Sequence, residues 1–240
     1  MKKFTILVSL FLFSIGTSFS QDPTFGESTT NHSGVNLAKG NWYLGGMLGF
    51  TFTNEKHEDS GGSSQGPKTT SFDLLPTGGV VIGDKTAVGG SLGYLSSTEK
   101  RYEIDFSTGD EFELKNTENQ FVISPFGSFF KELDDDFFCM GYLYGMLGFG
   151  SQKDEFLSGD EIFTQEFKKN SWELGFSPGF KWFPNEKISL GFSYGKIYYG
   201  GETLTDKEDS EHKWKTSQGG IDLDLSTARV GISYWFPAEF

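Results

Sequence analysis

Residues 227–240 read TARVGISYWFPAEF, and this C-terminal stretch decides the fold. Its apolar and aromatic residues recur at every second position, namely Ala228, Val230, Ile232, Tyr234, Phe236, Ala238 and Phe240. Up to Ser233 the positions between them are small or polar and include Arg229. Because alternate side chains of a strand point to opposite faces, one face is apolar and the other is polar. A transmembrane β-barrel strand needs these two faces, one for lipid and one for the interior.

The N-terminus predicts export from the cytoplasm. Lys2 and Lys3 precede an apolar run over residues 4–15, and the small-aromatic-small triplet of residues 18–20 follows. This order predicts a secretory signal peptide over residues 1–20. The run is shorter than the roughly 20 apolar residues of a transmembrane helix. We therefore expect a signal peptide at residues 1–20, a polar periplasmic tail at 21–39 and a barrel at 40–240.

Charge and composition exclude several functions. The chain has 20 basic and 33 acidic residues. Removing the two signal lysines leaves 18 against 33, a net charge of −15, which repels phosphate and argues against nucleic-acid binding. The single cysteine, Cys139, excludes an intrachain disulfide and a cysteine-based zinc site. No second apolar run is long enough for a membrane helix, so a closed barrel is the remaining way to satisfy the backbone in lipid.

Alternation predicts an all-β fold, an eight-stranded antiparallel up-and-down transmembrane barrel. The expected strands cover about 41–53, 70–83, 86–100, 119–130, 137–150, 172–182, 188–195 and a last strand from about 221, whose alternation slips near Leu225. Short turns alternate with four long acidic loops at about 54–69, 101–118, 151–168 and 201–220. Short periplasmic turns and long extracellular loops are typical of outer-membrane barrels.

Four charged residues share the face of small residues, namely Asp73, Glu173, Lys181 and Arg229. Arg or Lys facing lipid costs about 2–4 kcal/mol at the bilayer midplane, so we place all four in the lumen. We hypothesise that Arg229 pairs with Glu173 or Asp73 and closes the lumen, as a polar plug or as a gate. Large aromatic residues are expected in the interfacial girdles, namely Trp42, Trp172, Trp182, Tyr198, Tyr199 and Trp235.

With its signal peptide, eight strands, loop asymmetry and terminal phenylalanine, the chain resembles the small OmpA/OmpX-type outer-membrane barrels. A soluble lipocalin-like barrel is the rival, but its apolar side chains would crowd inward. The resemblance implies the outer membrane of a Gram-negative bacterium, contact with outer-membrane lipid and lipopolysaccharide, and a monomer. It also implies that the barrel-assembly machinery reads Tyr234, Phe236 and Phe240. No cell-wall-binding domain follows the last strand, so we do not expect anchoring to the cell wall.

The sequence contains few residues that could form a catalytic or metal-binding site. The histidines are His32, His57 and His212, and no nucleophile motif stands beside them. The acidic run over residues 206–211 has calcium-type oxygens but no EF-hand spacing. We expect no catalytic residue, metal or cofactor. The leading function is a membrane scaffold whose loops bind an unknown extracellular ligand. A narrow channel for small solutes is the alternative, and a lipid-modifying enzyme comes third.

Overall fold

The computed structural model describes residues 37–59, 62–104, 111–158, 161–223 and 228–237. The expected signal peptide, most of the expected tail and Phe240 lie outside these ranges. Ten antiparallel strands are formed, namely β1 Trp42–Asp59, β2 Gly62–Gly83, β3 Thr86–Ile104, β4 Glu111–Asp134, β5 Phe137–Ser158, β6 Glu161–Asn185, β7 Ile188–Ser193, β8 Lys196–Asp206, β9 Lys213–Asp222 and β10 Arg229–Phe236.

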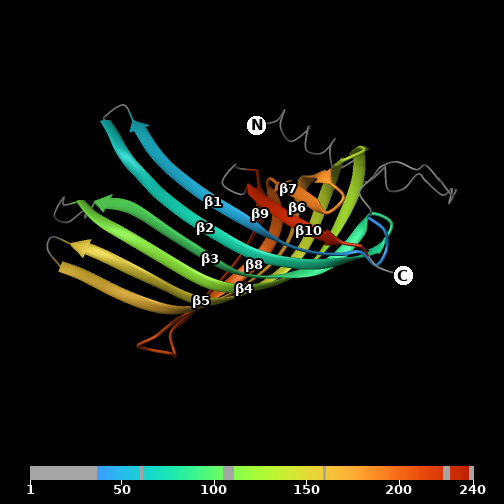
Figure 1. The fold of residues 1–240 in the computed structure, drawn as a ribbon. Helices are drawn as coiled ribbons and strands as arrows, with labels where there is room; N and C mark the ends of the chain where they lie inside the picture. The colour runs from blue at the N-terminus through green and yellow to red at the C-terminus, as the bar shows by residue number, and fades with distance from the viewer. Residues whose placement is uncertain (1–36, 60–61, 105–110, 159–160, 224–227, 238–240) are drawn as a thin grey trace. The chain divides into compact units, whose positions relative to one another are not determined.

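Eight of these strands close into a ring, as the sequence predicts. Sequential hairpins join β1 to β6, and β10 pairs with β1 on one side and with β7 on the other. Pairing between β5 and β6 and between β6 and β7 completes the circuit. The remaining hairpin, β8–β9, prolongs the wall along the outer half of β6 (Figure 1). The all-β, up-and-down barrel expected from alternation is therefore present.

Two strands, β8 and β9, are added to the expected eight, with interruptions between β7 and β8 and between β9 and β10. They occupy most of the segment predicted as the loop 201–220. Gly195 adopts a φ of +75° between β7 and β8, a conformation that favours glycine. Ser177 of β6 donates a hydrogen bond to the Gly195 carbonyl at 2.6 Å, and the Tyr194 hydroxyl donates to the carbonyl of Leu223, just after β9. The two interruptions are thus tied together. Leu225, where the alternation slips, lies outside the described residues between β9 and β10.

The four expected long loops are mostly extended β-hairpins, which is a second correction. The strands continue through almost all of these segments, so β4 has 24 residues and β6 has 25. A transmembrane β-strand needs only about 9–11 residues, so roughly half of each long strand projects beyond the membrane. Cross-strand pairs hold these projections in register, for example Lys115–Glu155 at 2.6 Å and Lys100–Glu113 at 2.9 Å.

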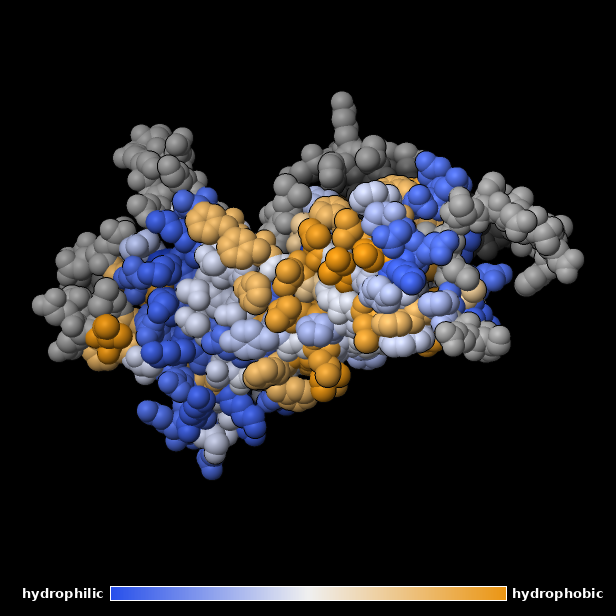
Figure 2. All heavy atoms as spheres, in the orientation of Figure 1, coloured by the Kyte–Doolittle hydropathy of each residue, from blue (hydrophilic) through white to orange (hydrophobic). Residues whose placement is uncertain are grey.

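An apolar band covers the outer face of the ring near the turn end. Its exposed side chains include Leu44, Leu48, Phe50, Leu74, Leu92, Phe121, Ile123, Leu143, Leu147, Leu174, Leu190, Val230 and Ile232. Figure 2 shows orange side chains across the middle of the molecule and blue ones over the hairpins. Such exposure is too extensive for a soluble surface and matches a band that faces lipid. Within the described residues, no helix is long and apolar enough to cross a membrane.

Candidate functional site

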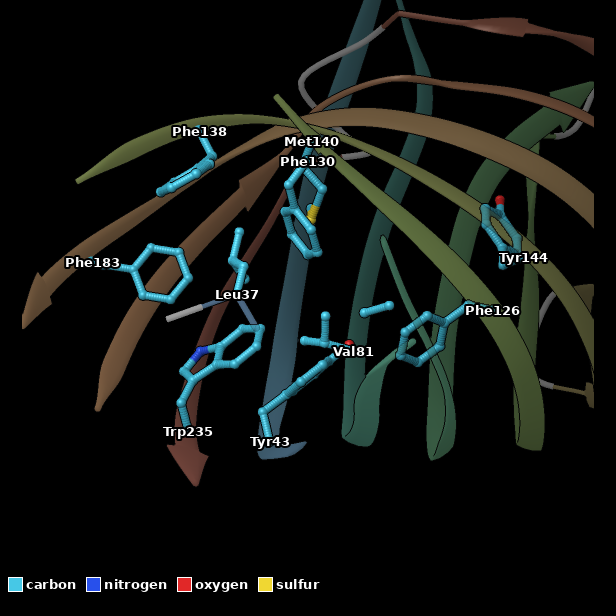
Figure 3. Packing of buried hydrophobic residues seen from close by; sticks show 11 residues of the cluster. Leu37, Tyr43, Val81, Phe126, Phe130, Phe138, Met140, Tyr144, Phe183 and Trp235 are labelled. Carbon is cyan, nitrogen blue, oxygen red and sulfur yellow. The ribbon is translucent and has the colours of Figure 1, made fainter. Parts of the chain in front are cut away.

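The inner half of the lumen is filled by a cluster of buried apolar residues, which we call the aromatic plug. It consists of Leu37, Tyr43, Val81, Ala87, Phe126, Phe130, Phe138, Met140, Tyr144, Phe183 and Trp235 (Figure 3). Phe183 is 0% exposed, and its ring lies 5.4 Å from that of Trp235 and 5.5 Å from that of Phe138. An eight-stranded barrel has an interior that side chains can just fill. The plug fills it at this level.

The sequence did not predict the plug. Trp235 was expected in an interfacial girdle, but it is buried, and its indole nitrogen donates to Ser189 at 2.8 Å. Tyr198, another expected girdle residue, lies under the Lys196 ammonium and lines a cavity. The expected lumen face held mainly glycine and serine. Small residues on that face leave the space that large rings from other strands occupy: a Cβ on Gly79 would lie 2.7 Å from the Tyr43 ring.

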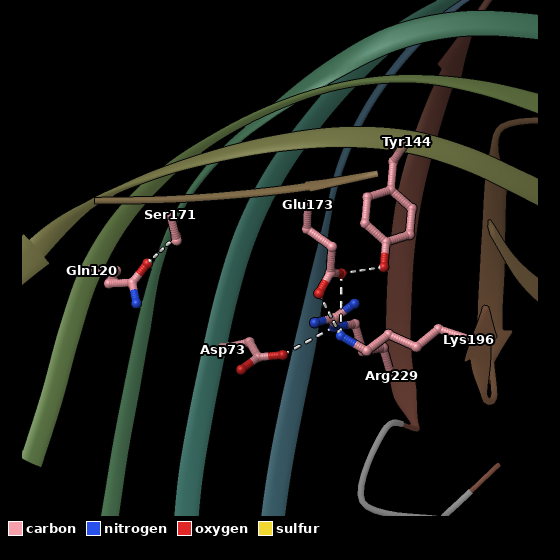
Figure 4. Close-up of polar contacts among 7 residues, drawn as sticks. All are labelled: Asp73, Gln120, Tyr144, Ser171, Glu173, Lys196 and Arg229. Carbon is pink, nitrogen blue, oxygen red and sulfur yellow. Dashed lines mark hydrogen bonds and ion pairs between the residues drawn. The ribbon is translucent and has the colours of Figure 1, made fainter. Parts of the chain in front are cut away.

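A layer of charged side chains lies above the plug, and Arg229 and Asp73 form its first pair. The Arg229 Nε donates to Asp73 Oδ2 at 2.9 Å (Figure 4). Gly49 of β1 stands between these two strands, and a Cβ there would lie 2.6 Å from Asp73 Oδ2. The glycine therefore provides the room in which the ion pair forms.

Glu173 takes different partners from those the sequence suggested. The Lys196 Nζ lies 2.8 Å from Glu173 Oε2, and the Tyr144 hydroxyl donates to Oε1 at 2.6 Å. The sequence predicted neither Lys196 nor Tyr144 as a partner of Glu173. Lys196 follows the Gly195 bend at the end of the expected seventh strand, and Tyr144 belongs to the strand whose two faces are both apolar. No periodic signal marked either residue as lumenal.

Lys181, the fourth predicted lumen charge, is separate from this layer. It is 7% exposed, and its Nζ lies 5.1 Å from the ring centroids of Tyr43 and Trp235 and 5.5 Å from that of Phe130. Ring faces attract cations at these distances. Among the described residues it forms no ion pair with Asp73 or Glu173.

A further buried cation lies in the outer half of the lumen. The Lys169 Nζ is 2.8 Å from Glu118 Oε2 and 2.7 Å from Glu202 Oε2, bridging β4 and β8. Lys169 and Glu202 line a cavity of about 190 Å³ together with Gln120 and Glu173. Sequence reasoning missed this triad because Glu118 and Lys169 sit at the edge of segments predicted as loops.

Outside the membrane, the hairpin ion pairs perturb titration. Hydrogen bonds from Lys115 and Lys153 lower the pKa of Glu155 to about 2. At the β8–β9 turn, backbone amides and His212 lower the pKa of Asp209, whose Oδ2 lies 2.7 Å from the imidazole Nδ1. The acids of this turn cap backbone amides, and no group of three or more possible metal ligands gathers within the described ranges.

The aromatic residues of the last strand pack on β1, and one of the three histidines has a described side chain. Phe236 stacks on Trp42 of β1 with ring centroids 3.8 Å apart, and Tyr234 packs against Phe236 at 4.7 Å. Phe240 and His32 lie outside the described residues, as does the side chain of His57. His212 is exposed on a turn beside Trp214.

A closed antiparallel ring with an apolar outer band and a filled interior is an outer-membrane β-barrel of the small type. No family model and no curated protein match the chain. Among solved structures, the chain is similar to the outer membrane protein OprG from Pseudomonas aeruginosa, with 16% identity, a TM-score of 0.44, and coverage of 87% of this chain and 100% of OprG.

Two further structures are similar. A major outer membrane protein from Thermus thermophilus has 14% identity and a TM-score of 0.46, covering 82% of this chain and 98% of that one. Ail, the attachment invasion locus protein of Yersinia pestis, has 12% identity and a TM-score of 0.29, covering 83% and 100%.

Proposed function

We propose that this protein is a non-enzymatic, non-conducting scaffold of the Gram-negative outer membrane that presents its hairpins as an extracellular binding surface. The observation that carries the proposal is the closed lumen. The aromatic plug occupies the inner half, and the Arg229–Asp73 and Lys196–Glu173 pairs lie above it. A solute passing through would have to displace packed rings and break ion pairs.

The hairpins provide the second support. Ile162, Phe163 and Trp214 are exposed beyond the apolar band, on strands that otherwise carry many charges. Exposed apolar side chains surrounded by polar residues are typical of binding surfaces. Adhesion or ligand binding through the β5–β6 and β8–β9 hairpins is therefore the role we infer for them.

The partners in the membrane follow from the outer face. Outer-membrane lipid, including lipopolysaccharide in the outer leaflet, would contact the apolar band. The barrel-assembly machinery would read the terminal aromatic strand through Tyr234, Phe236 and Phe240. We infer a monomer, because the ring closes on itself through pairing between β10 and β1.

Conductance tests the closed lumen. The protein without residues 1–20 would be refolded in detergent, checked by heat-modifiable gel mobility, and inserted in planar bilayers. We expect no protein-dependent steps, whereas Phe183→Ala, which opens the plug, should produce small steps. Steady steps from the wild-type protein would contradict the proposal and favour a narrow solute channel.

Surface binding needs a separate measurement. We expect cells displaying the wild-type protein to bind a host-cell or matrix surface, and a double variant Ile162→Ser, Phe163→Ser to lose binding. Leu133→Ser, an exposed apolar residue at a periplasmic turn, is the matched control and should bind normally. Equal binding by both variants would remove this hairpin from the proposed surface.

A further inference from the structure

Among the described residues, the buried Lys181 ammonium has no counterion. Within the described residues its Nζ lies over the rings of Tyr43, Phe130 and Trp235 and forms no ion pair with a carboxylate. Rings stabilise a cation, but they do not neutralise it. Burying an ammonium is costly unless it is paired or neutralised.

The nearby carboxylates of the lumen are paired with other cations. Asp73 is bound by Arg229, and Glu173 is bound by Lys196. Among Lys181, Arg229 and Lys196, Lys181 is therefore the cation that has no carboxylate partner within the described residues.

A cavity of about 40 Å³ lies beside Lys181. Its lining includes both Lys181 and Arg229, together with the hydroxyl-bearing residues Thr77, Ser128, Tyr142 and Ser193. About 10–15 Å³ on this measure is enough for one water, so the cavity has room for a small ion but not for an organic acid. The Thr77 hydroxyl already donates to the Leu75 carbonyl at 2.9 Å, so Ser128, Tyr142 and Ser193 are the hydroxyl groups that can donate to an anion there.

We propose that this cavity binds a small monovalent inorganic anion of the halide class, held between the Lys181 ammonium and the hydroxyl groups. The anion neutralises the charge on Lys181 and joins β6 to the strands on the opposite side of the lumen. It thereby stabilises the plug. Water alone would fill the space but would leave the charge unbalanced.

Crystals grown in bromide test the location. We expect one anomalous peak in the cavity, within about 3.5 Å of the Lys181 Nζ, in the wild-type protein. Lys181→Met should lose the peak, and Lys187→Met, at an exposed turn, should keep it. No peak in the wild type, or a peak that persists in Lys181→Met, would overturn the proposal.

Chloride-dependent stability tests whether binding is more than adventitious. Wild-type protein in detergent would be unfolded with urea while gluconate replaces chloride at constant ionic strength. At chloride 100 times its Kd, the ratio of folded to unfolded protein should rise about 100-fold over that in gluconate. Lys187→Met should show the same rise and Lys181→Met none. A wild-type ratio independent of chloride would mean an adventitious ion only and would overturn the proposal, even with a bromide peak present.

Discussion

Removing one partner of the Arg229–Asp73 pair should destabilise the barrel, and removing both should cost little more. The pair has a 2.9 Å contact, with side chains 28% and 21% exposed. Losing one partner of a fully buried pair costs about 3–5 kcal/mol, whereas an exposed pair contributes about 0–1 kcal/mol. This pair is intermediate, so Arg229→Met and Asp73→Asn should each lower the free energy of unfolding by about 2 kcal/mol.

The double variant isolates the interaction. Without either charge no orphan ion remains, so the double variant should also lose about 2 kcal/mol, which gives a coupling energy of about 2 kcal/mol. The assay is urea unfolding in lipid vesicles, followed by tryptophan fluorescence and gel mobility. Lys207–Glu166, with a 2.8 Å contact and side chains 48% and 49% exposed, is the control and should couple by less than about 0.5 kcal/mol. Additive losses at Arg229 and Asp73 would refute the reasoning.

Three further predictions concern a glycine, a hairpin carboxylate and strand β9. Gly49→Ala should lower the unfolding free energy by about 1–2 kcal/mol, because its Cβ would lie 2.6 Å from Asp73 Oδ2. Gly46→Ala is the control and should be tolerated, because the atom nearest to its Cβ would be 3.7 Å away. Equal effects of the two variants in urea unfolding would contradict this prediction. The pKa of Glu155 is lowered to about 2, so its ion pairs contribute stability above the ordinary pKa of 4.5, and this stability is lost as the pH falls towards 2. Carboxyl NMR should show the Glu155 pKa rising in Lys115→Met. A titration midpoint near 4.5 for Glu155 in the wild-type protein would exclude the pairing. The β9 amides should exchange with deuterium faster than those of β6 between residues 172 and 182, because β9 is exposed and pairs only with β8 among the described strands; equal protection would mean that β9 has a second partner.

The sequence predicted the ring because lipid imposes a strong pattern on one face. Every lipid-facing position must be apolar, so strands such as β6 and β10 show their period in a single chain. The break at Gly195 was not predicted. The backbone there leaves the strand conformation at a glycine inside a Gly-rich strand, and many glycines of this chain occupy ordinary strand positions. The hairpins were taken for loops because both of their faces contact water, so the pattern of period two disappears although the backbone pairing continues.

The lumen could be predicted only in part, since its side chains meet between strands rather than along one strand. Arg229 and Asp73 are 156 positions apart, and their shared polar face predicted a common compartment without determining partners. Tyr144 belongs to a strand whose two faces are both apolar, so local alternation did not show which way it points. The alternation of β10 puts Trp235 on the face of Arg229, which the girdle prediction overlooked. What decides the direction of Tyr144 is the space left by Gly175 on the facing strand, where a Cβ would lie 2.5 Å from the Tyr144 ring. In a barrel this narrow, the glycines of one strand determine which large residues of its neighbours can point inward, and closure of the lumen follows from that complementarity.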